Sequence, residues 1–145
     1  MQPLTPHYFV ATNVLLEKDG KILLSLRQNT GWADNQMTIP GGHTEAGETV
    51  TQAAIREAKE ELGLNLKPED LTFLCTENKM TQRPYVSVIF IAKTDQKPEN
   101  TEPEKCQKLV WVDPHNLPQN VTENFRQIIE KAYLKNGPYL EFIPS

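Results

Sequence analysis

The chain has 145 residues, of which 38% are hydrophobic, and its formal net charge is −4 at pH 7. Because domains of roughly 100–150 residues are the commonest size, a single domain over residues 1–145 is expected. The negative charge argues against a broad surface for a nucleic acid polymer or acidic lipid, and no apolar run reaches the roughly 20 residues that cross a bilayer.

Two apolar runs begin the predicted sheet, over residues 8–17 and 21–27. Residues 18–20 between them read Lys-Asp-Gly, and an Asp-Gly pair tolerates the positive backbone angles that a tight turn requires. The two runs are therefore predicted to pair as a hairpin.

A glycine-rich loop, residues 39–48, follows and leads into a helix. Thr49 and Gln52 have the spacing of a capping box, and Gly63 stands where a left-handed residue ends a helix. These signals predict a helix over Val50–Leu62, with an apolar stripe that packs against the sheet.

The remaining elements are three strands and a closing helix. The strands are rich in β-branched and aromatic residues and are bounded by turn-forming residues. The closing helix has apolar residues at helical spacing, with Thr122 placed to cap it and Gly137 placed to stop it. The strands are predicted over residues 71–78, 85–93 and 108–113, and the helix over residues 122–134.

Three glutamates of the central helix, Glu57, Glu60 and Glu61, fall within an arc of about 100° away from the apolar stripe. Their mutual repulsion disfavours the helix by roughly 0.2–0.5 kcal/mol per pair, so local stability alone would not select this arrangement. One interpretation is a solvated acidic face that Arg56 and Lys59 neutralise. The other is a set of carboxylates that converge on Mg²⁺, which prefers oxygen ligands.

The loop and the helix together match a known pattern. Gly42, five residues, Glu48, seven residues, and then Arg-Glu-Ala-Lys-Glu-Glu-Leu-Gly-Leu over residues 56–64 resembles the Nudix box, G-x5-E-x7-R-E-U-x-E-E-x-G-U. Only Ala58 departs from it, as a small residue where a bulkier aliphatic one is usual. The resemblance implies an α+β fold in which a mixed β-sheet is sandwiched between α-helices and a loop-helix-loop carries the catalytic groups.

The Nudix resemblance also assigns roles to residues. It implies that Glu57, Glu60, Glu61 and the Gly41 carbonyl are ligands of Mg²⁺ or Mn²⁺, and that the three glutamates form the catalytic group. Structural support of the box is implied for Gly42 and Gly63 and for a pair between Arg56 and Glu48, which would hold the loop against the helix. The general base and the number of metal ions stay open.

The implied reaction is hydrolysis of a diphosphate bond in a nucleoside diphosphate linked to another group. The segment over residues 102–120 is similar to MutT-type proteins, which favours a nucleoside or deoxynucleoside triphosphate cleaved to the monophosphate and pyrophosphate. Nucleotide sugars, ADP-ribose and dinucleoside polyphosphates stay open as substrates. Two non-catalytic interpretations also stay open, namely a nucleotide-binding Nudix module and an acidic helix that docks a basic partner.

Five residues outside the helix are further candidates. Arg27, at the end of the second predicted strand, would contact substrate phosphate or else be a solvated strand-end arginine. Glu102 and Glu104, in a later acidic loop, are candidates for an additional metal ligand or base, with Glu104 favoured. Trp32 lies in a polar loop where it would border the substrate or a homodimer contact, and His43 is expected to be solvated.

The cysteines and the amino-terminal segment bear on the cellular compartment. Cys75 and Cys106 form no close pair of the metal-ligand type, so two reduced thiols are expected. Residues 1–9 lack the basic start and the long apolar stretch of a secretion signal. A cytoplasmic protein is therefore expected. The Nudix resemblance implies a small nucleotide as its partner, and the oligomeric state stays open.

Overall fold

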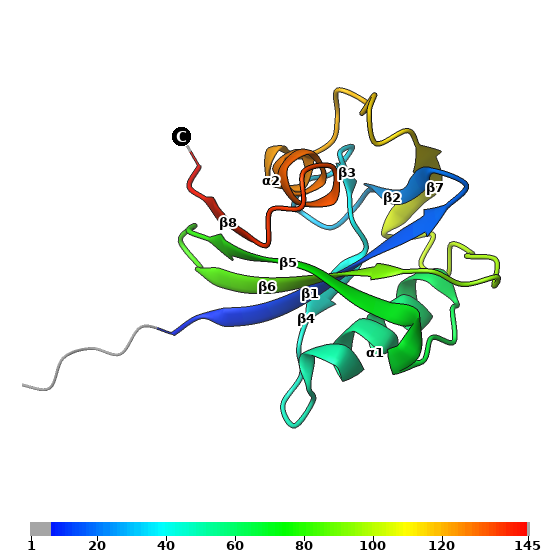
Figure 1. Cartoon of the computed structure of the whole chain (residues 1–145), viewed down its shortest axis with the longest axis horizontal. Coiled ribbons are helices and arrows are strands. Elements are labelled where there is room, and N and C mark those ends of the chain that lie inside the picture. The colour runs from blue at the N-terminus through cyan, green and yellow to red at the C-terminus, as the bar shows by residue number, and fades with distance from the viewer. Residues whose placement is uncertain (1–6, 145) are drawn as a thin grey trace, which may run out of the picture.

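The computed structural model of the protein describes residues 7–144 and is shown in Figure 1. Residues 1–6, which belong to the segment used to judge a secretion signal, lie outside the described residues. Within the described part, none of the helices combines the length and the apolar character needed to cross a membrane.

The predicted hairpin is confirmed as β1 (Phe9–Lys18) and β2 (Lys21–Arg27), which pair antiparallel next to the turn. Asp19 and Gly20 form that turn with positive φ angles of 52° and 75°. Beyond the turn the two strands separate. β1 then pairs in parallel with β6 and antiparallel with β4, whereas β2 pairs antiparallel with β3 and β7.

The three later strands are also confirmed, with small differences in their ends. They are β5 (Leu71–Lys79), β6 (Tyr85–Ala92) and β7 (Cys106–Val112). Three short strands were not predicted: β3 (Met37–Thr38), β4 (Gly41–His43) and β8 (Tyr139–Phe142). The main path of the mixed sheet is β3-β2-β1-β6-β5-β8, with β4 beside β1 and β7 beside β2.

Helices cover the sheet on two sides, which confirms the predicted sandwich (Figure 1). α1 spans Val50–Leu62, as predicted, and lies below the sheet in the view of Figure 1. On the opposite side, α2 (Glu123–Gln127) continues into a wider helical segment, η2 (Ile128–Tyr133). A single short turn of helix, η1 (Pro68–Asp70), precedes β5.

The cap predicted for the closing helix is corrected by the structure. Thr122 occupies the N-cap position of α2, but its side chain makes no capping hydrogen bond. Its hydroxyl donates instead to the Asn124 side-chain oxygen at 3.0 Å. The predicted side-chain cap is therefore wrong: a capping hydroxyl oxygen accepts from a backbone N–H of the first helical turn, whereas the Thr122 side chain is turned toward Asn124.

The alternation of β1 divides the core into two clusters. Val14 and Leu16 point toward α1, where they join Leu62 and the alanines of that helix. Leu15 points the other way, toward Phe125 and the two isoleucines that open η2. Fully burying one leucine contributes roughly 1.5–3 kcal/mol, so both helices are firmly anchored to the sheet between them.

Candidate active site

The ends of α1 are fixed by the capping groups that the sequence predicts. Thr49 Oγ1 accepts from the Gln52 backbone N–H at 3.1 Å, and Gln52 Oε1 accepts from the Thr49 backbone N–H at 2.9 Å. Gly63 ends the helix with a φ of 66°, which a residue with a side chain adopts only with strain. The glutamates of α1 therefore have a defined height and rotation relative to the loop before the helix.

Arg56 joins that loop to the helix. Its guanidinium binds Glu48 through two hydrogen bonds, of 2.7 Å from Nε and 2.9 Å from Nη2, and also donates to the His43 carbonyl oxygen at 3.0 Å. The hydrogen bond from Arg56, helped by the Glu45 backbone N–H, lowers the pKa of Glu48 to about 2. Arg56 and Glu48 thus occupy the supporting positions implied by the Nudix resemblance.

The same guanidinium also holds two of the helix carboxylates. Arg56 Nη1 donates to Glu57 Oε1 at 2.9 Å and to Glu60 Oε2 at 3.1 Å. Lys59, which was expected to help neutralise the acidic face, donates to the Asn65 side chain at 2.7 Å instead. The carboxylate repulsion along α1 is therefore offset mainly through one residue.

Glu61 lies deeper and has no such partner. Burial, with the nearby charges of Glu57 and Glu102, raises the pKa of Glu61 to about 8. A hydrogen bond from the Gly41 backbone N–H opposes this rise. Within residues 7–144, Glu61 Oε2 is buried without a hydrogen-bond partner, which is costly for a carboxylate unless a cation compensates it.

The register of β4 turns the Gly41 backbone toward this carboxylate. The Val14 N–H donates to the Pro40 carbonyl at 2.8 Å, and Gly41 is opposite Asn13, one residue further along the pair. In an antiparallel pair the hydrogen-bonding positions alternate, so the N–H and C=O of Gly41 point away from β1. Both groups therefore face the side on which Gly41 meets Glu61.

Neither glycine of this strand leaves room for a side chain. A Cβ at Gly41 would collide with the Thr12 carbonyl oxygen, and one at Gly42 would lie 2.5 Å from Glu57 Oε1. Gly42 thus allows the Glu57 carboxylate to rest directly against the backbone of β4. Gly42 therefore follows from the close approach of β4 to α1, and Gly41 follows from the close approach of β4 to β1.

These groups border a pocket of about 300 Å³, here called the acid pocket. Its walls include Gly41, the three helix glutamates and Glu102. Glu104 does not line this pocket, and its backbone carbonyl accepts from the Asn29 side chain at 3.3 Å. The structure therefore brings Glu57, Glu60 and Glu61 together and selects Glu102, rather than Glu104, as the nearby loop acid.

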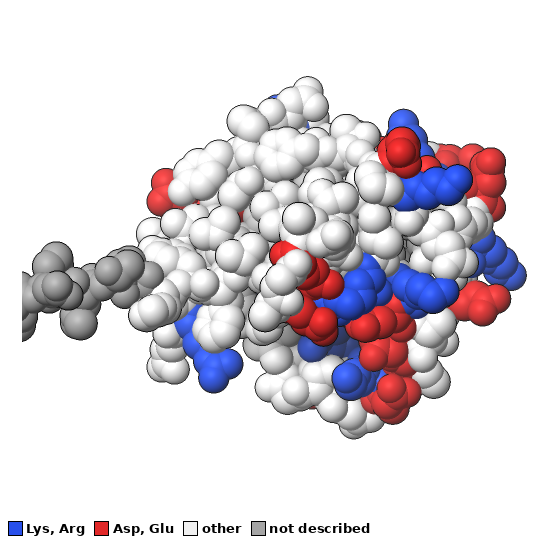
Figure 2. All heavy atoms as spheres, turned by 90° about the horizontal axis from the view of Figure 1, so that it is seen from below, with Lys and Arg blue, Asp and Glu red and all other residues white. Residues whose placement is uncertain are grey.

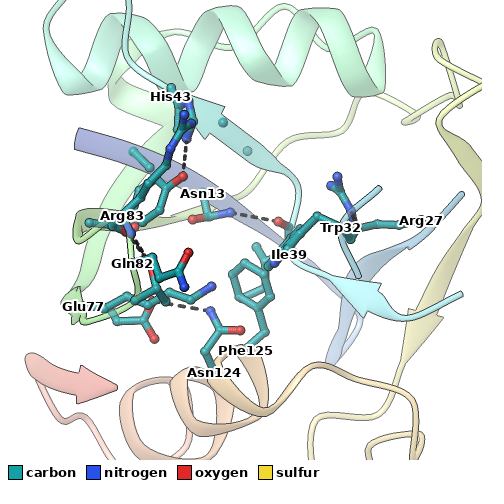
Figure 3. Close-up of a pocket in the computed structure, with 17 residues that line it drawn as sticks. Asn13, Arg27, Trp32, Ile39, His43, Glu77, Gln82, Arg83, Asn124 and Phe125 are labelled. Atoms are coloured by element: carbon teal, nitrogen blue, oxygen red, sulfur yellow. Dashed lines mark hydrogen bonds between the residues drawn. The ribbon is translucent and has the colours of Figure 1, made fainter. Parts of the chain in front are cut away.

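A larger pocket of about 680 Å³, here called the wide pocket, adjoins the acid pocket (Figure 3). Arg27, Ile39, Gly41 and Gly42 line both. Arg27 donates to the Trp32 carbonyl at 2.9 Å and lies 4.9 Å from the centre of the Trp32 ring. Arg27 therefore lines both pockets and Trp32 lines the wide pocket, and their contact with a substrate stays a prediction.

His43 is exposed, as expected, yet it is held in an aromatic stack. Its ring lies 5.5 Å from Phe9 and 5.2 Å from Tyr85, and its Nε2 is 3.1 Å from the Tyr85 hydroxyl. Arg83 lies over the Phe9 ring at 5.4 Å. This stack was not predictable from the sequence, because its rings come from three different strands, β1, β4 and β6.

Two polar residues of the wide pocket were also missed by sequence reasoning, Glu77 on β5 and Asn124 on α2 (Figure 3). Both are buried, and the Asn124 side-chain N–H donates to Glu77 Oε1 at 3.5 Å. The one available signal was the alternation of β5, which puts Glu77 on the same face as the buried Cys75.

The acid pocket fits a divalent cation by the chemistry of its donors. Among residues 7–144, no group of three or more histidine, cysteine, aspartate or glutamate side chains could hold a metal ion by itself. Mg²⁺ sites in enzymes usually take one or two carboxylates together with waters and substrate phosphates. The buried acceptor of Glu61, the outward carbonyl of Gly41 and the adjacent Glu57 match such a partial donor set.

The surface around α1 carries charges of both signs. Figure 2, which views the molecule from below Figure 1, shows acidic side chains lying beside lysines and arginines on this face. An acidic helix that docks a basic partner would present a continuous negative surface. The mixed charges therefore give no support to the docking interpretation.

A mixed sheet between helices, with carboxylates presented by a loop-helix-loop beside a wide pocket, is the architecture of metal-assisted hydrolases of the Nudix class. The chain belongs to the Nudix hydrolase family, since a family model described as NUDIX domain matches residues 7–132. Members of this family are pyrophosphohydrolases that generally use divalent metals, and this protein is an enzyme of that class.

Comparison with individual proteins agrees with this assignment. An ADP-ribose pyrophosphatase from Methanocaldococcus jannaschii is 33% identical over 132 residues, which are 90% of this chain and 77% of the relative. The structure of a MutT NUDIX hydrolase from Burkholderia pseudomallei has a TM-score of 0.78 at 28% identity, covering 86% of this chain and 98% of that chain.

A third protein shares the fold at lower identity. It is a bifunctional NMN adenylyltransferase/ADP ribose pyrophosphatase from Francisella tularensis, whose crystal structure contains AMP and a Mn ion. It matches with a TM-score of 0.67 at 24% identity, over 94% of this chain and 44% of that chain.

Proposed function

We infer that this protein hydrolyses a nucleoside or deoxynucleoside triphosphate to the monophosphate and pyrophosphate, with Mg²⁺ or Mn²⁺ bound by Glu57, Glu60, Glu61 and the Gly41 carbonyl. The observation that carries this proposal is the junction of the two pockets. The acid pocket suits a metal-bound diphosphate, the wide pocket suits a nucleoside, and Arg27 lines both.

Each residue has a defined part in this proposal. A divalent ion, when bound, offsets charge on the phosphate oxygens and makes an attacking water more acidic. Arg27 donates hydrogen bonds to phosphate oxygens at the junction. Arg56 holds Glu57 and Glu60 in place through the hydrogen bonds already described, and Glu48 fixes Arg56 in turn.

The proton of the attacking water goes to a carboxylate of the acid pocket. Glu61 and Glu102 are both candidates, since each lines that pocket and neither is held by Arg56. A general base contributes about 10²–10⁴-fold to a rate. Comparing the rates of the Glu61→Gln and Glu102→Gln variants can therefore show which residue is the base.

A second candidate substrate is ADP-ribose. The archaeal relative named for that activity aligns over most of this chain. A pocket of about 680 Å³ also has room for more than one ring system, because ligand pockets commonly measure about 300–1,000 Å³. ADP-ribose would place its second ribose, rather than a terminal phosphate, on the far side of the scissile bond.

The test is a hydrolysis panel with Mg²⁺ and with Mn²⁺. Nucleoside triphosphates, ADP-ribose, nucleotide sugars and dinucleoside polyphosphates are incubated with the wild type, Glu61→Gln and the exposed control Glu69→Gln. We expect triphosphates to give the monophosphate and pyrophosphate, Glu61→Gln to lose this activity, and the control to keep it. Cleavage of ADP-ribose alone would replace the first candidate by the second, and nucleotide binding without any cleavage would refute both.

A further inference from the structure

The wide pocket contains a buried carboxyl group that the proposed hydrolysis does not use. Only 2% of the surface of Glu77 is exposed, and in the described part of the chain its Oε2 has no hydrogen-bond partner. Its Oε1 has a single long hydrogen bond, of 3.5 Å, from Asn124. A buried carboxyl group with this much unused acceptor capacity is expensive unless a ligand supplies hydrogen-bond donors.

The position of this carboxyl group is set by β5 and α2. The alternation of β5 turns Glu77 to the side of the sheet covered by α2, where Asn124 sits at the start of that helix. The Thr122 hydroxyl donates to the Asn124 side-chain oxygen, which leaves the amide N–H groups directed to Glu77. In Figure 3, Glu77 and Asn124 lie at one end of the pocket and Arg27 and Trp32 lie at another.

The remaining polar groups near Glu77 do not occupy its free oxygen. Ser87, on β6, lines the same pocket and is itself buried. Asn13 also lines it, and its side-chain N–H is already donated to the Ile39 carbonyl at 2.9 Å. Lys79, two residues along β5 on the same face, also lines the pocket, and its charge partly offsets the rise that burial causes in the pKa of Glu77, but its ammonium group lies over the Trp32 ring at 4.8 Å. In the described part of the chain Glu77 Oε2 therefore stays an unpaired acceptor, which suits a ligand that carries donors.

We propose that Glu77 is the residue that selects the nucleobase, and that it does so by accepting two hydrogen bonds from a base with a guanine-type edge. The inference rests on the proposed function, because it places the nucleoside in the wide pocket with its phosphates toward the acid pocket. Arg27 lines both pockets, so it would lie beside the phosphates of a nucleotide bound in this orientation.

The preference for guanine follows from donor and acceptor positions. A carboxylate has two parallel acceptors and no donor, and guanine presents two adjacent donors, N1–H and the 2-amino group. Adenine and cytosine place one donor beside one acceptor, and uracil places one donor between two acceptors. Each of these bases would leave a carboxylate oxygen unpaired or facing an acceptor, and buried sites reject such ligands strongly.

The substitution Glu77→Gln tests this pairing, because an amide has the same shape but one donor and one acceptor. Binding of GMP, AMP, CMP and UMP is measured by calorimetry at pH 8 in EDTA, so that no metal contributes. Burial raises the pKa of Glu77 to about 7, so the wild-type side chain is a carboxylate at this pH. Glu69→Gln is the matched control, since Glu69 is exposed and lies outside the wide pocket.

We expect the wild type and the control to bind GMP at least tenfold more tightly than the other three nucleotides. Glu77→Gln should weaken the binding of GMP at least tenfold and strengthen the binding of AMP or CMP. If this variant fails to fold, Glu77→Asp retains both acceptors at a shorter reach and should weaken GMP without transferring preference to another base. Four affinities within threefold of one another, no measurable binding, or an unchanged preference in Glu77→Gln would overturn the proposal.

The two proposals fail separately. The metal-free measurement does not depend on hydrolysis, so it reports on base recognition whether or not the protein cleaves a triphosphate. A guanine preference without hydrolysis would remove the proposed function and leave the role of Glu77 in binding. Hydrolysis of several triphosphates at similar rates, with no dependence on residue 77, would support the proposed function and remove the role of Glu77 in selecting the base.

Discussion

The substitution Glu61→Gln should raise the stability of the metal-free protein and reduce the stabilisation that Mg²⁺ provides. In the folded protein the pKa of Glu61 is raised from 4.5 to about 8, so the folded state holds its proton more tightly than the unfolded chain does. The wild type therefore loses stability as the pH rises between these two values. The two pKa values differ by about 3.5. At roughly 1.4 kcal/mol for each pKa unit, the free energy of unfolding falls by at most about 5 kcal/mol over this range.

Glutamine does not titrate, so the variant escapes this loss. In EDTA at pH 8 it should melt at a higher temperature than the wild type, and the difference should shrink toward pH 5. Saturating Mg²⁺ should narrow this difference, because it stabilises the wild type and not the variant. At a hundred times the dissociation constant it adds about 2.7 kcal/mol to the wild type, or roughly 5–10 °C for a chain of this size.

Differential scanning calorimetry over pH 5–8, with EDTA or with Mg²⁺, measures both effects, and Glu69→Gln serves as the control. An equal rise with Mg²⁺ in wild type and variant would show that Glu61 does not hold the ion. A variant less stable than the wild type in EDTA at pH 8 would refute the reasoning that Glu61 is an uncompensated buried carboxylate.

Five further substitutions test the rest of the site. Arg56→Lys keeps the charge but loses the forked hydrogen bonds, and should lower metal affinity or kcat by about 10–100-fold in a metal titration of activity. Gly42→Ala displaces only a carboxylate and should abolish activity with little change in melting temperature, whereas Gly41→Ala meets backbone and should also unfold the protein at a clearly lower temperature. Glu102→Gln should reduce kcat at least tenfold in a steady-state assay, and Glu104→Gln should leave it unchanged.

The parts of the fold predicted correctly from the sequence are those set by local chemistry. The bounds of α1 follow from Thr49, Gln52 and Gly63, all within or next to the helix, and the structure agrees at both ends. The first turn follows from Asp19 and Gly20 for the same reason. Capping and turn signals act over a few residues, so no knowledge of the tertiary structure was needed.

The strands that were missed depend on distant partners. β4 contains two glycines and a histidine, which have little strand preference, and it exists because β1 pairs with it in register. β8 follows the predicted helix stop and pairs in parallel with β5, more than 60 residues earlier in the chain. Neither pairing leaves a pattern within the short segment itself.

In the candidate site, too, the residues placed by local sequence were predicted and those placed by distant contacts were missed. The glutamates of α1 share a helix face by periodicity, so their proximity was predictable, and the Nudix box pattern pointed to the same residues. The choice of Glu102 over Glu104 depends on a turn in which the Lys105 and Cys106 N–H groups both donate to the Glu102 carbonyl. Glu77 was missed because its burial requires α2 to pack against β5.

The two pockets are built largely from different stretches of chain, and this separation has a consequence for how the enzyme can be changed. The acid pocket is formed by the end of β2 and the residues just after it, residues 39–42, the second half of α1 and residues between 102 and 109, whereas the far end of the wide pocket is formed by residues 77–87 and the start of α2. Grafting the second group from another enzyme of the same fold would exchange the recognised base and leave the hydrolytic groups untouched. On the proposed roles of the two pockets, selectivity and bond cleavage would be altered independently, and a library confined to residues 77–87 and 122–125 would change the substrate while the proposed hydrolytic groups stay the same.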